Sequence, residues 1–314
     1  MMSTLNSIKN LRFKRQKSKY FYGQYKKSNY FEGWYLKHQK ESNTITFIPG
    51  MNIDSQGNKL AFIQVVTNDD SYFINYLYPE FNVSSERLCI NIGNSTFSDT
   101  GIEVHIEEKD LVIKGNIKYG DIVRLDRNIM GPFAVFSSKM QCNHEIISLR
   151  HRLSGEIKVN EEIFNFDGGV GYIEKDWGSS FPKKYSWVQC NDFRDRTCSV
   201  FATIADIPFM GRSFNGCICV VYYEGMEYKL CTYNGVKVLK NNSTGMILKR
   251  GKYRLEVEIM DENPQRLLAP INGHMSKVIH EHSGCKAIFK FFADDKLEFN
   301  LQSNNCNFEF VSGM

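Results

Sequence analysis

The 314-residue chain lacks the features that define several classes of protein. No apolar run approaches the roughly 18 residues that a membrane-spanning helix needs, since the longest candidate, Cys217–Tyr223, has seven. Only 7 prolines are present, so no Pro-rich linker separates the two halves. Collagen-like, coiled-coil and low-complexity patterns are absent too. What remains is a globular protein with enough chain for a sizeable core.

Acidic residues are missing before Glu32, whereas eight Lys and Arg precede it. The remaining 31 Lys and Arg stand against 35 Asp and Glu, so the rest of the chain is mildly acidic. Residues 1–28 are therefore predicted to form a basic, flexible arm. Either this arm contacts an anionic membrane surface or it is a solvated terminus. No nucleic-acid partner is expected.

No metal or disulfide pattern is present either. The nine cysteines are odd in number and lack metal-ligand spacing, and Cys217 and Cys219 read as two buried thiols on one strand. The seven histidines form no known ligand motif, so no metal is expected. Because no apolar h-region follows the basic residues, no secretory signal is indicated. We expect a cytoplasmic protein with reduced thiols, in peripheral contact with a membrane if the arm binds one.

Helix signals are scarce, and short segments rich in Val, Ile, Phe, Tyr and Thr dominate, such as Ala61–Thr67 and Gly216–Tyr223. Turn residues such as Asn234-Gly235 separate them. Strands at about ten-residue spacing are typical of antiparallel barrels and sandwiches. The pattern runs twice, which predicts two packed β-barrel-like domains over residues 29–160 and 161–314. Gly168–Gly171 is interpreted as a flexible join near this boundary.

The first segment that carries chemistry is Tyr30–Tyr35. In a strand, Glu32 and Trp34 share one face while Gly33 and Tyr35 share the other. A carboxyl beside an indole on an inward face would be desolvated and would keep its proton, as a general acid must. The alternative is a Glu32 bonded to backbone or to Arg, with Trp34 in the core.

The second segment is Gly171–Gly178, in which Glu174 and Asp176 point one way and Lys175 and Trp177 the other. Two carboxyls on one face repel when both are ionised, so one is driven to hold a proton.

In the strand that follows, Trp187, Gln189 and Asn191 share a face. An aromatic ring and two amides would suit a cavity wall that holds an apolar ligand by a polar head. Because unpaired buried amides are costly, the alternative is a hydrogen-bond network between the domains.

At these segments the chain resembles the tocopherol cyclase family. The resemblance rests on the stretches YFEGWY (30–35), GNSTFS (93–98), LSGEI (153–157), GYIEKDWGSSFPKKYSWVQCN (171–191) and LLAPINGHM (267–275). It implies two lipocalin-like antiparallel β-barrel or sandwich domains, with an apolar cavity near their junction. Members of the family close the chromanol ring of vitamin E, and related lipocalin-like proteins include carotenoid hydratases.

The implied reaction protonates a prenyl double bond, and the phenol oxygen then adds to the tertiary cation, with no cofactor. On this resemblance, Glu32 or Glu174 is the acid and Asp176 the second candidate. Trp34, Trp177 and Trp187 would stabilise the cation through their ring faces, and Gln189 and Asn191 would hold the ligand's hydroxyl groups. The richness in Lys, Asn and Ile is typical of an AT-rich bacterial genome, and many such bacteria make no tocopherol. The substrate is therefore expected to differ from that of the plant enzymes and to be another prenylated hydroquinone or isoprenoid. The alternative is a non-catalytic lipid- or quinone-binding protein.

Overall fold

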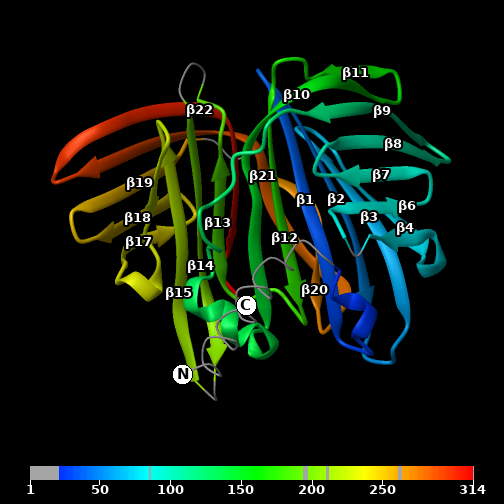
Figure 1. The fold of residues 1–314 in the computed structure, drawn as a ribbon, viewed down its shortest axis with the longest axis horizontal. Helices are drawn as coiled ribbons and strands as arrows, with labels where there is room; N and C mark the ends of the chain where they lie inside the picture. Colours follow the sequence, from blue (N-terminus) through cyan, green and yellow to red (C-terminus); the bar gives the residue numbers. More distant parts are fainter. Residues whose placement is uncertain (1–20, 85, 194–196, 210–211, 261–263, 314) are drawn as a thin grey trace, which may run out of the picture.

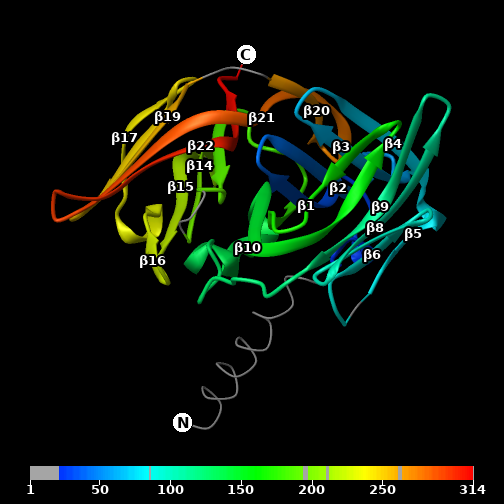
Figure 2. The same ribbon diagram turned by 90° about the horizontal axis from the view of Figure 1, so that it is seen from above.

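Two large antiparallel sheets lie side by side in the computed structural model, which describes residues 21–84, 86–193, 197–209, 212–260 and 264–313 (Figure 1). Both sheets are strongly curved when seen from above (Figure 2). The all-β fold expected from the strand spacing is confirmed. Within the described ranges, no helix has the length and apolar character needed to cross a membrane.

The first sheet has the strand order β4-β3-β2-β1-β12-β10-β9-β8-β7-β6-β5, and β11 pairs with β10 outside this path. Its strands, with the short 3-10 helices near them, are η2 (Gly23–Tyr25), β1 (Tyr30–Lys40), β2 (Asn43–Ile53), β3 (Lys59–Thr67), β4 (Ser71–Leu77), η3 (Tyr78–Glu80), β5 (Phe81–Val83), β6 (Cys89–Ile92), β7 (Ser95–Ser98), β8 (Gly101–Glu108), β9 (Leu111–Tyr119), η4 (Gly131–Lys139), β10 (Cys142–Val159), β11 (Glu162–Asn165) and β12 (Val170–Gly178).

The second sheet has the order β16-β15-β14-β13-β22-β21-β19-β18-β17, and β20 pairs with β21. Its elements are β13 (Tyr185–Cys190), β14 (Cys198–Phe209), β15 (Arg212–Tyr223), β16 (Met226–Lys229), η5 (Thr232–Asn234), β17 (Lys237–Asn242), β18 (Gly245–Arg250), β19 (Tyr253–Ile259), β20 (Pro264–Ile271), β21 (His274–Ala293) and β22 (Lys296–Val311).

The chain changes sheet later than the boundary expected at residue 160. β11 and β12 both pair with strands of the first sheet, so the crossing lies between Gly178 and Tyr185. Gly168–Gly171, interpreted as a join between domains, instead leads from β11 into β12 within one sheet. The prediction of a join was wrong because a turn between two strands of one sheet and a linker between domains can both be rich in glycine.

Residues 1–20 of the expected basic arm lie outside the described residues. The end of that arm is folded: Phe21 and Tyr22 pack against the core of the first sheet. The backbone N–H groups of Tyr22 and Gly23 donate hydrogen bonds to the carboxylate of Glu32. These contacts fix the chain at residue 22, just before η2.

Each sheet curls around its own apolar core, and a third apolar cluster lies between the sheets. Alternation along a strand decides which core a side chain joins. On β1, Trp34 and Leu36 enter the core of the first sheet, whereas Tyr35 enters the cluster between the sheets. β13 is buried at every residue and β12 from Val170 to Lys175, because both faces of these strands are covered.

Gly178 ends β12 where the chain leaves the first sheet. Its φ of +156° is one that side chains rarely adopt, and an added Cβ would lie 2.1 Å from the carbonyl oxygen of Gln141. Only glycine permits this close approach of the backbone to the neighbouring strand. The glycine after Trp177 therefore has a structural role in the crossing.

All nine cysteines fall within the described residues and are free thiols. Cys217 and Cys219 are both buried, as their place in an apolar run predicts.

Candidate active site between the two sheets

A mostly apolar cavity of about 180 Å³ lies between the sheets, at the junction where a cavity was expected. Aromatic and aliphatic side chains such as Phe31, Phe62 and Phe181 form most of its wall. His144, Glu174 and Asp176 reach it from the first sheet, and Trp187, Glu281 and Glu309 from the second. A concave apolar pocket with a few converging polar groups is the usual form of a small-molecule site.

Strand alternation places the first set of polar groups. Asp176 pairs with Gly33 on β1 and with His144 on β10, and Glu174 pairs with Tyr35. Because opposite residues of neighbouring strands share a face, these side chains all turn toward the second sheet. The grouping of Glu174 with Asp176, and of Gly33 with Tyr35, is as the alternation predicted.

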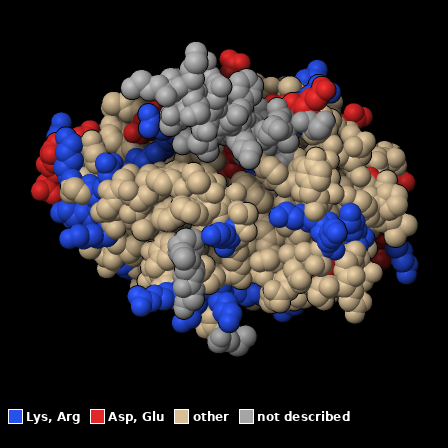
Figure 3. Space-filling model, turned by 60° about the horizontal axis from the view of Figure 1, so that its bottom comes forward, with Lys and Arg blue, Asp and Glu red and all other residues tan. Residues whose placement is uncertain are grey.

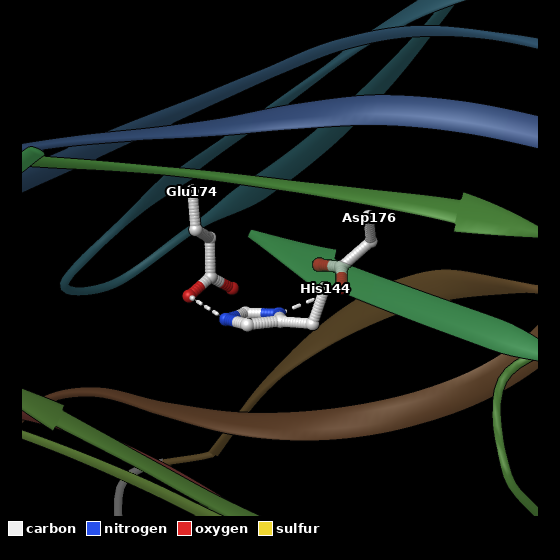
Figure 4. A group of neighbouring side chains, drawn as sticks. All are labelled: His144, Glu174 and Asp176. Atoms are coloured by element: carbon white, nitrogen blue, oxygen red, sulfur yellow. Dashed lines mark hydrogen bonds and ion pairs between the residues drawn. The ribbon is translucent and has the colours of Figure 1, made fainter. Parts of the chain in front are cut away.

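His144 lies between the two carboxyls, as Figure 4 shows. Its Nδ1 is 2.8 Å from Oδ1 of Asp176, and its Nε2 is 3.5 Å from Oε2 of Glu174. The hydroxyl of Tyr172 donates a 2.5 Å hydrogen bond to the same Oε2. His144 and Tyr172 therefore both approach the Oε2 atom of Glu174. The His144 ring also stacks on Phe201, with centroids 4.7 Å apart.

Burial and charge set the protonation of this group. Burial raises the pKa of Glu174 to about 8, even though the His144 cation lowers it. Burial lowers the pKa of His144, but the carboxyls of Asp176 and Glu174 outweigh this effect and raise it to about 9. Near neutral pH Glu174 is thus neutral and His144 is cationic, and the titrations of these two groups depend on each other.

Glu32 lies outside the cavity, with Trp34, Lys175 and Trp177 on the opposite face of the same two strands. Glu32 pairs with Trp177 across the strands, and Trp34 with Lys175. The Glu32 carboxylate is 2.5 Å from Nζ of Lys175 and is fully buried. It accepts further hydrogen bonds from backbone N–H groups and from the hydroxyl of Tyr30. An ion-paired carboxylate away from the cavity does not fit the acid role predicted for Glu32, and the bonded alternative describes it better.

The three tryptophans separate in the same way. Trp187 lines the cavity, whereas Trp34 and Trp177 pack in the first sheet around the ammonium group of Lys175, 5.1 Å from each ring centroid. The cation that these two rings stabilise is therefore Lys175. Trp187 is the one tryptophan of the three that a ligand in the cavity would contact.

Gln189 and Asn191 hold the two sheets together instead of lining the cavity. Lys37 Nζ donates to Oε1 of Gln189 at 3.0 Å, and Gln39 Nε2 donates to Oδ1 of Asn191 at 2.5 Å. Asn191 in turn donates to the carbonyl groups of Leu149 and Gly171. This is the hydrogen-bond network between the domains that stood as the alternative to ligand binding. It forms a polar part of the contact between the two sheets.

His144, Glu174 and Asp176 also have the donor types of a metal site. Their possible ligand atoms all lie within 4.8 Å of one another. A metal ion would require His144 to be neutral and both carboxyls ionised. The close contacts of the His144 ring with two carboxyls match a protonated imidazole equally well, since a proton neutralises the same charges.

Several residues of the cavity carried no signal in the sequence. His144, Glu281 and Glu309 stand in ordinary strand segments, and only strand pairing across long separations brings each to its partner. The sequence did carry a signal for the ion pair of Lys175 with Glu32, because Lys175 interrupts the apolar alternation in the segment Gly171–Gly178. A buried lysine needs an anion, and that anion is Glu32 in the segment Tyr30–Tyr35.

Residues 110–306 match the model of a family described as tocopherol cyclase-like. Over 121 residues the chain is 28% identical to a probable chloroplastic tocopherol cyclase of Oryza sativa subsp. japonica, covering 37% of this chain and 26% of that protein. Over 86 residues it is 30% identical to the chloroplastic tocopherol cyclase of Zea mays, covering 26% of this chain and 18% of that protein. The matched stretches thus span far less than two thirds of either plant protein.

Two solved structures share the fold. A putative AttH from Nitrosomonas europaea has a TM-score of 0.57 and 11% identity, covering 90% of this chain and 93% of that chain. CghA in complex with Sch210972 has a TM-score of 0.54 and 7% identity, covering 90% and 89%. At such identities the likeness shows the fold alone, which is lipocalin-like as the resemblance implied. Because the family model spans more than half of its length, the chain belongs to the tocopherol cyclase-like family.

Proposed function

We propose that the protein is a cofactor-independent acid catalyst that cyclises or hydrates a prenylated hydroquinone or another isoprenoid in the cavity between its sheets. Glu174 is the acid. The observation that carries this proposal is a buried carboxyl at the wall of an apolar cavity, 3.5 Å from the ring of His144, where burial raises the carboxyl pKa to about 8. Family membership supports the class of reaction.

The environment of Glu174 serves both halves of a proton transfer. Burial keeps the proton on the carboxyl near neutral pH. When the proton leaves for the alkene carbon, the new carboxylate lies 3.5 Å from the His144 ring and accepts the Tyr172 hydroxyl hydrogen bond. Donors already in place where charge develops are the main source of catalysis in such sites. Asp176 would act by keeping His144 protonated and oriented, not as the acid itself.

The tertiary cation that follows would form among aromatic rings. Trp187 and Tyr35 line the cavity with their ring centroids 5.4 Å apart, and Phe31 and Phe181 lie in the same wall. The negative faces of such rings stabilise a cation in a dry site, where little water is present to capture it. Addition of an internal phenol oxygen gives the ring, and addition of water gives the hydrate.

The test is incubation of the purified protein with a panel of prenylated hydroquinones, followed by mass spectrometry. A ring-closed product has the mass of the substrate and a shifted retention, whereas a hydrate is about 18 mass units heavier. Glu174→Gln should reduce either product by about 100-fold or more, the usual contribution of a general acid. Glu161→Gln, on an exposed surface position, is the matched control and should change nothing.

A wild-type rate that survives in Glu174→Gln would contradict the assignment of the acid. Tight binding of a prenylated ligand that is recovered unchanged would favour the alternative, a lipid- or quinone-binding protein, because an apolar cavity is sufficient for binding.

Peripheral contact with a membrane is part of the same proposal. Met130 and Phe133, at the start of η4, line the cavity, and Val135 and Phe136 in η4 expose 62% and 43% of their surface. Figure 3, in which the bottom of the molecule comes forward, shows broad areas without charge, with Lys and Arg side chains among and around them. An apolar segment with basic groups around it suits an anionic lipid surface. Deletion of residues 1–20, or Val135→Ser with Phe136→Ser, should weaken binding to anionic vesicles; unchanged binding in both would refute the contact.

A further inference from the structure

Two further carboxyls line the cavity from the second sheet, and nothing in the proposed acid chemistry uses them. Glu281 on β21 and Glu309 on β22 are partners across the strands, and Glu309 is in turn opposite Trp187 on β13. Partners across antiparallel strands have Cβ atoms about 4.5–5.5 Å apart. The second sheet thus presents two carboxyls and an indole in one row, opposite the wall that carries Glu174.

The two carboxyls are bonded unequally. The Oε1 atom of Glu281 accepts hydrogen bonds from the hydroxyl of Tyr35 at 2.6 Å and from Nδ2 of Asn307 at 2.5 Å. Its other oxygen, Oε2, is buried and has no hydrogen-bond partner among the described residues. The Oε2 atom of Glu309 accepts one hydrogen bond, from the hydroxyl of Tyr185 at 2.5 Å. The buried Oε2 atom of Glu281 is an acceptor without a donor, and such groups are costly to leave unpaired.

Adjacent buried carboxyls cannot both be ionised without strong repulsion. Burial raises the pKa of Glu309 well above its usual value, and the charge of Glu281 raises it further, with Glu174 and Asp176 adding to the effect. Burial also raises the pKa of Glu281, but Tyr35, Asn307 and the nearby Lys37 lower it in part. Burial lowers the pKa of Lys277, and the charge of Glu309 raises it in part. These groups favour a proton on Glu309 and a negative charge on Glu281.

We propose that Glu281 and Glu309 are the binding site for a hydroxyl group of the ligand, and that Glu281 accepts the proton of that hydroxyl when its oxygen forms the new bond. This inference rests on the proposed function. It assigns the ligand class as a molecule with a phenolic hydroxyl at one end and an isoprenoid double bond within reach of Glu174. The hydroxyl would donate to the unpartnered Oε2 atom of Glu281 and accept from protonated Glu309.

The proton balance of the step is complete. The O–H bond of Glu174 breaks as a C–H bond forms on the alkene, and the phenol oxygen bonds to the tertiary cation as its own proton moves to Glu281. The product is an isomer of the substrate, so no oxidant or reductant is required. Glu174 ends ionised and Glu281 protonated, and exchange with solvent after product release restores both.

Incorporation of deuterium from D2O distinguishes the role of Glu174 from that of Glu281. In D2O, protonation by Glu174 places deuterium on the alkene-derived carbon, whatever captures the cation. Glu281→Gln retains an acceptor for Tyr35 and Asn307 but cannot take a proton. We expect it to reduce ring closure by about 100-fold while deuterium still enters the substrate or a hydrated product. Glu174→Gln should abolish both signals. Glu298→Gln, an exposed position on the same strand β22, is the control.

Glu309→Gln should reduce ring closure less than Glu281→Gln does, because an amide imitates a protonated carboxyl. Equal losses in the two variants, or wild-type ring closure in Glu281→Gln, would overturn the proposal. A circular-dichroism melt of each variant shows whether it is folded.

Binding of the ligand can also be measured independently of turnover. Quenching of the protein's tryptophan fluorescence, which includes that of Trp187 at the cavity wall, compares the binding of a prenylated hydroquinone with that of its dimethyl ether, which has lost both hydroxyl donors. The wild type should prefer the free hydroquinone by about 10-fold, the effect of one hydrogen bond to a charged group, and Glu281→Gln should lose this preference. Preference without any turnover would refute the proposed catalysis but support the hydroxyl site; equal binding of the two ligands by the wild type would refute the site.

Discussion

Tyr35 and Glu174 are direct partners on β1 and β12, yet their polar groups bond in different directions. The Glu174 carboxyl accepts the Tyr172 hydroxyl within its own sheet, whereas the Tyr35 hydroxyl crosses the junction to Glu281 of the second sheet. One pair of neighbouring residues therefore links the acid of the first sheet to the carboxyl pair of the second. The two walls of the cavity are held at a fixed separation by this contact.

Removal of the Tyr35 hydroxyl should cost stability. Tyr35→Phe leaves Glu281 and Asn307 each without one buried partner. A hydrogen bond to a charged group contributes about 1.5–3 kcal/mol, so the free energy of unfolding in urea should fall by about that amount. Tyr25→Phe is the control, because Tyr25 is 81% exposed. Similar unfolding curves for the two variants would show that the contact contributes little.

The rate should fall as the pH rises through about 8. Glu174 acts as an acid only while it holds its proton, and its pKa is raised to about 8. His144→Gln removes the cation that lowers this pKa, so the falling limb of the pH–rate profile should move to higher pH while the maximal rate drops. A limb that stays in place in His144→Gln would mean that another group controls it.

Stability should change with pH in the same direction. The pKa of His144 is raised from 6.5 to about 9 and that of Glu174 from 4.5 to about 8. A group whose pKa is raised on folding stabilises fully below its unfolded pKa, and this contribution is lost as the pH rises through the folded value. The free energy of unfolding should therefore fall from pH 4.5 to about pH 8 through Glu174, and from pH 6.5 to about pH 9 through His144. In the double variant His144→Gln with Glu174→Gln the slope should be shallower, and an unchanged slope would point to other groups.

The alternation of side chains predicted the two faces of the key strands but not which face lines the cavity. Glu32 with Trp34, and Glu174 with Asp176, were grouped correctly, since a strand turns successive side chains to opposite sides. The choice of face depends on the register between β1 and β12, which sets Glu32 near Lys175. Register between strands far apart in sequence leaves no local trace, because both faces of a doubly covered strand are buried.

The same limit explains the carboxyl pair. Glu281 and Glu309 each follow an ordinary alternating pattern, and only the pairing of β21 with β22 makes them neighbours. Gln189 and Asn191 show the opposite case: their polarity on a buried strand was a clear signal of a partner, but a ligand and a second sheet satisfy an amide equally well. The partner proved to be the side chains of Lys37 and Gln39.

The buried ion pair of Glu32 and Lys175 should be far more important for stability than for activity. Lys175→Met leaves a buried carboxylate without its cation, and breaking a buried pair costs about 3–5 kcal/mol. The double variant Glu32→Gln with Lys175→Met should recover part of this loss in urea unfolding. Activity per folded molecule should persist, because both side chains face away from the cavity. Lys158→Met, which breaks an exposed pair with Glu161, should have little effect; activity lost with full stability in Lys175→Met would contradict this division.

Metal ions should inhibit the protein. The ligand atoms of His144, Glu174 and Asp176 lie within 4.8 Å of one another, so Zn²⁺ could bind there only by displacing the protons that the acid mechanism needs. Treatment with EDTA should leave the rate unchanged, and added Zn²⁺ should inhibit more strongly at higher pH, where fewer protons compete. Glu161→Gln should respond to Zn²⁺ as the wild type does, whereas Asp176→Asn should be less sensitive. Loss of activity in EDTA, with recovery on adding Zn²⁺, would replace Glu174 as the acid with a metal-bound water.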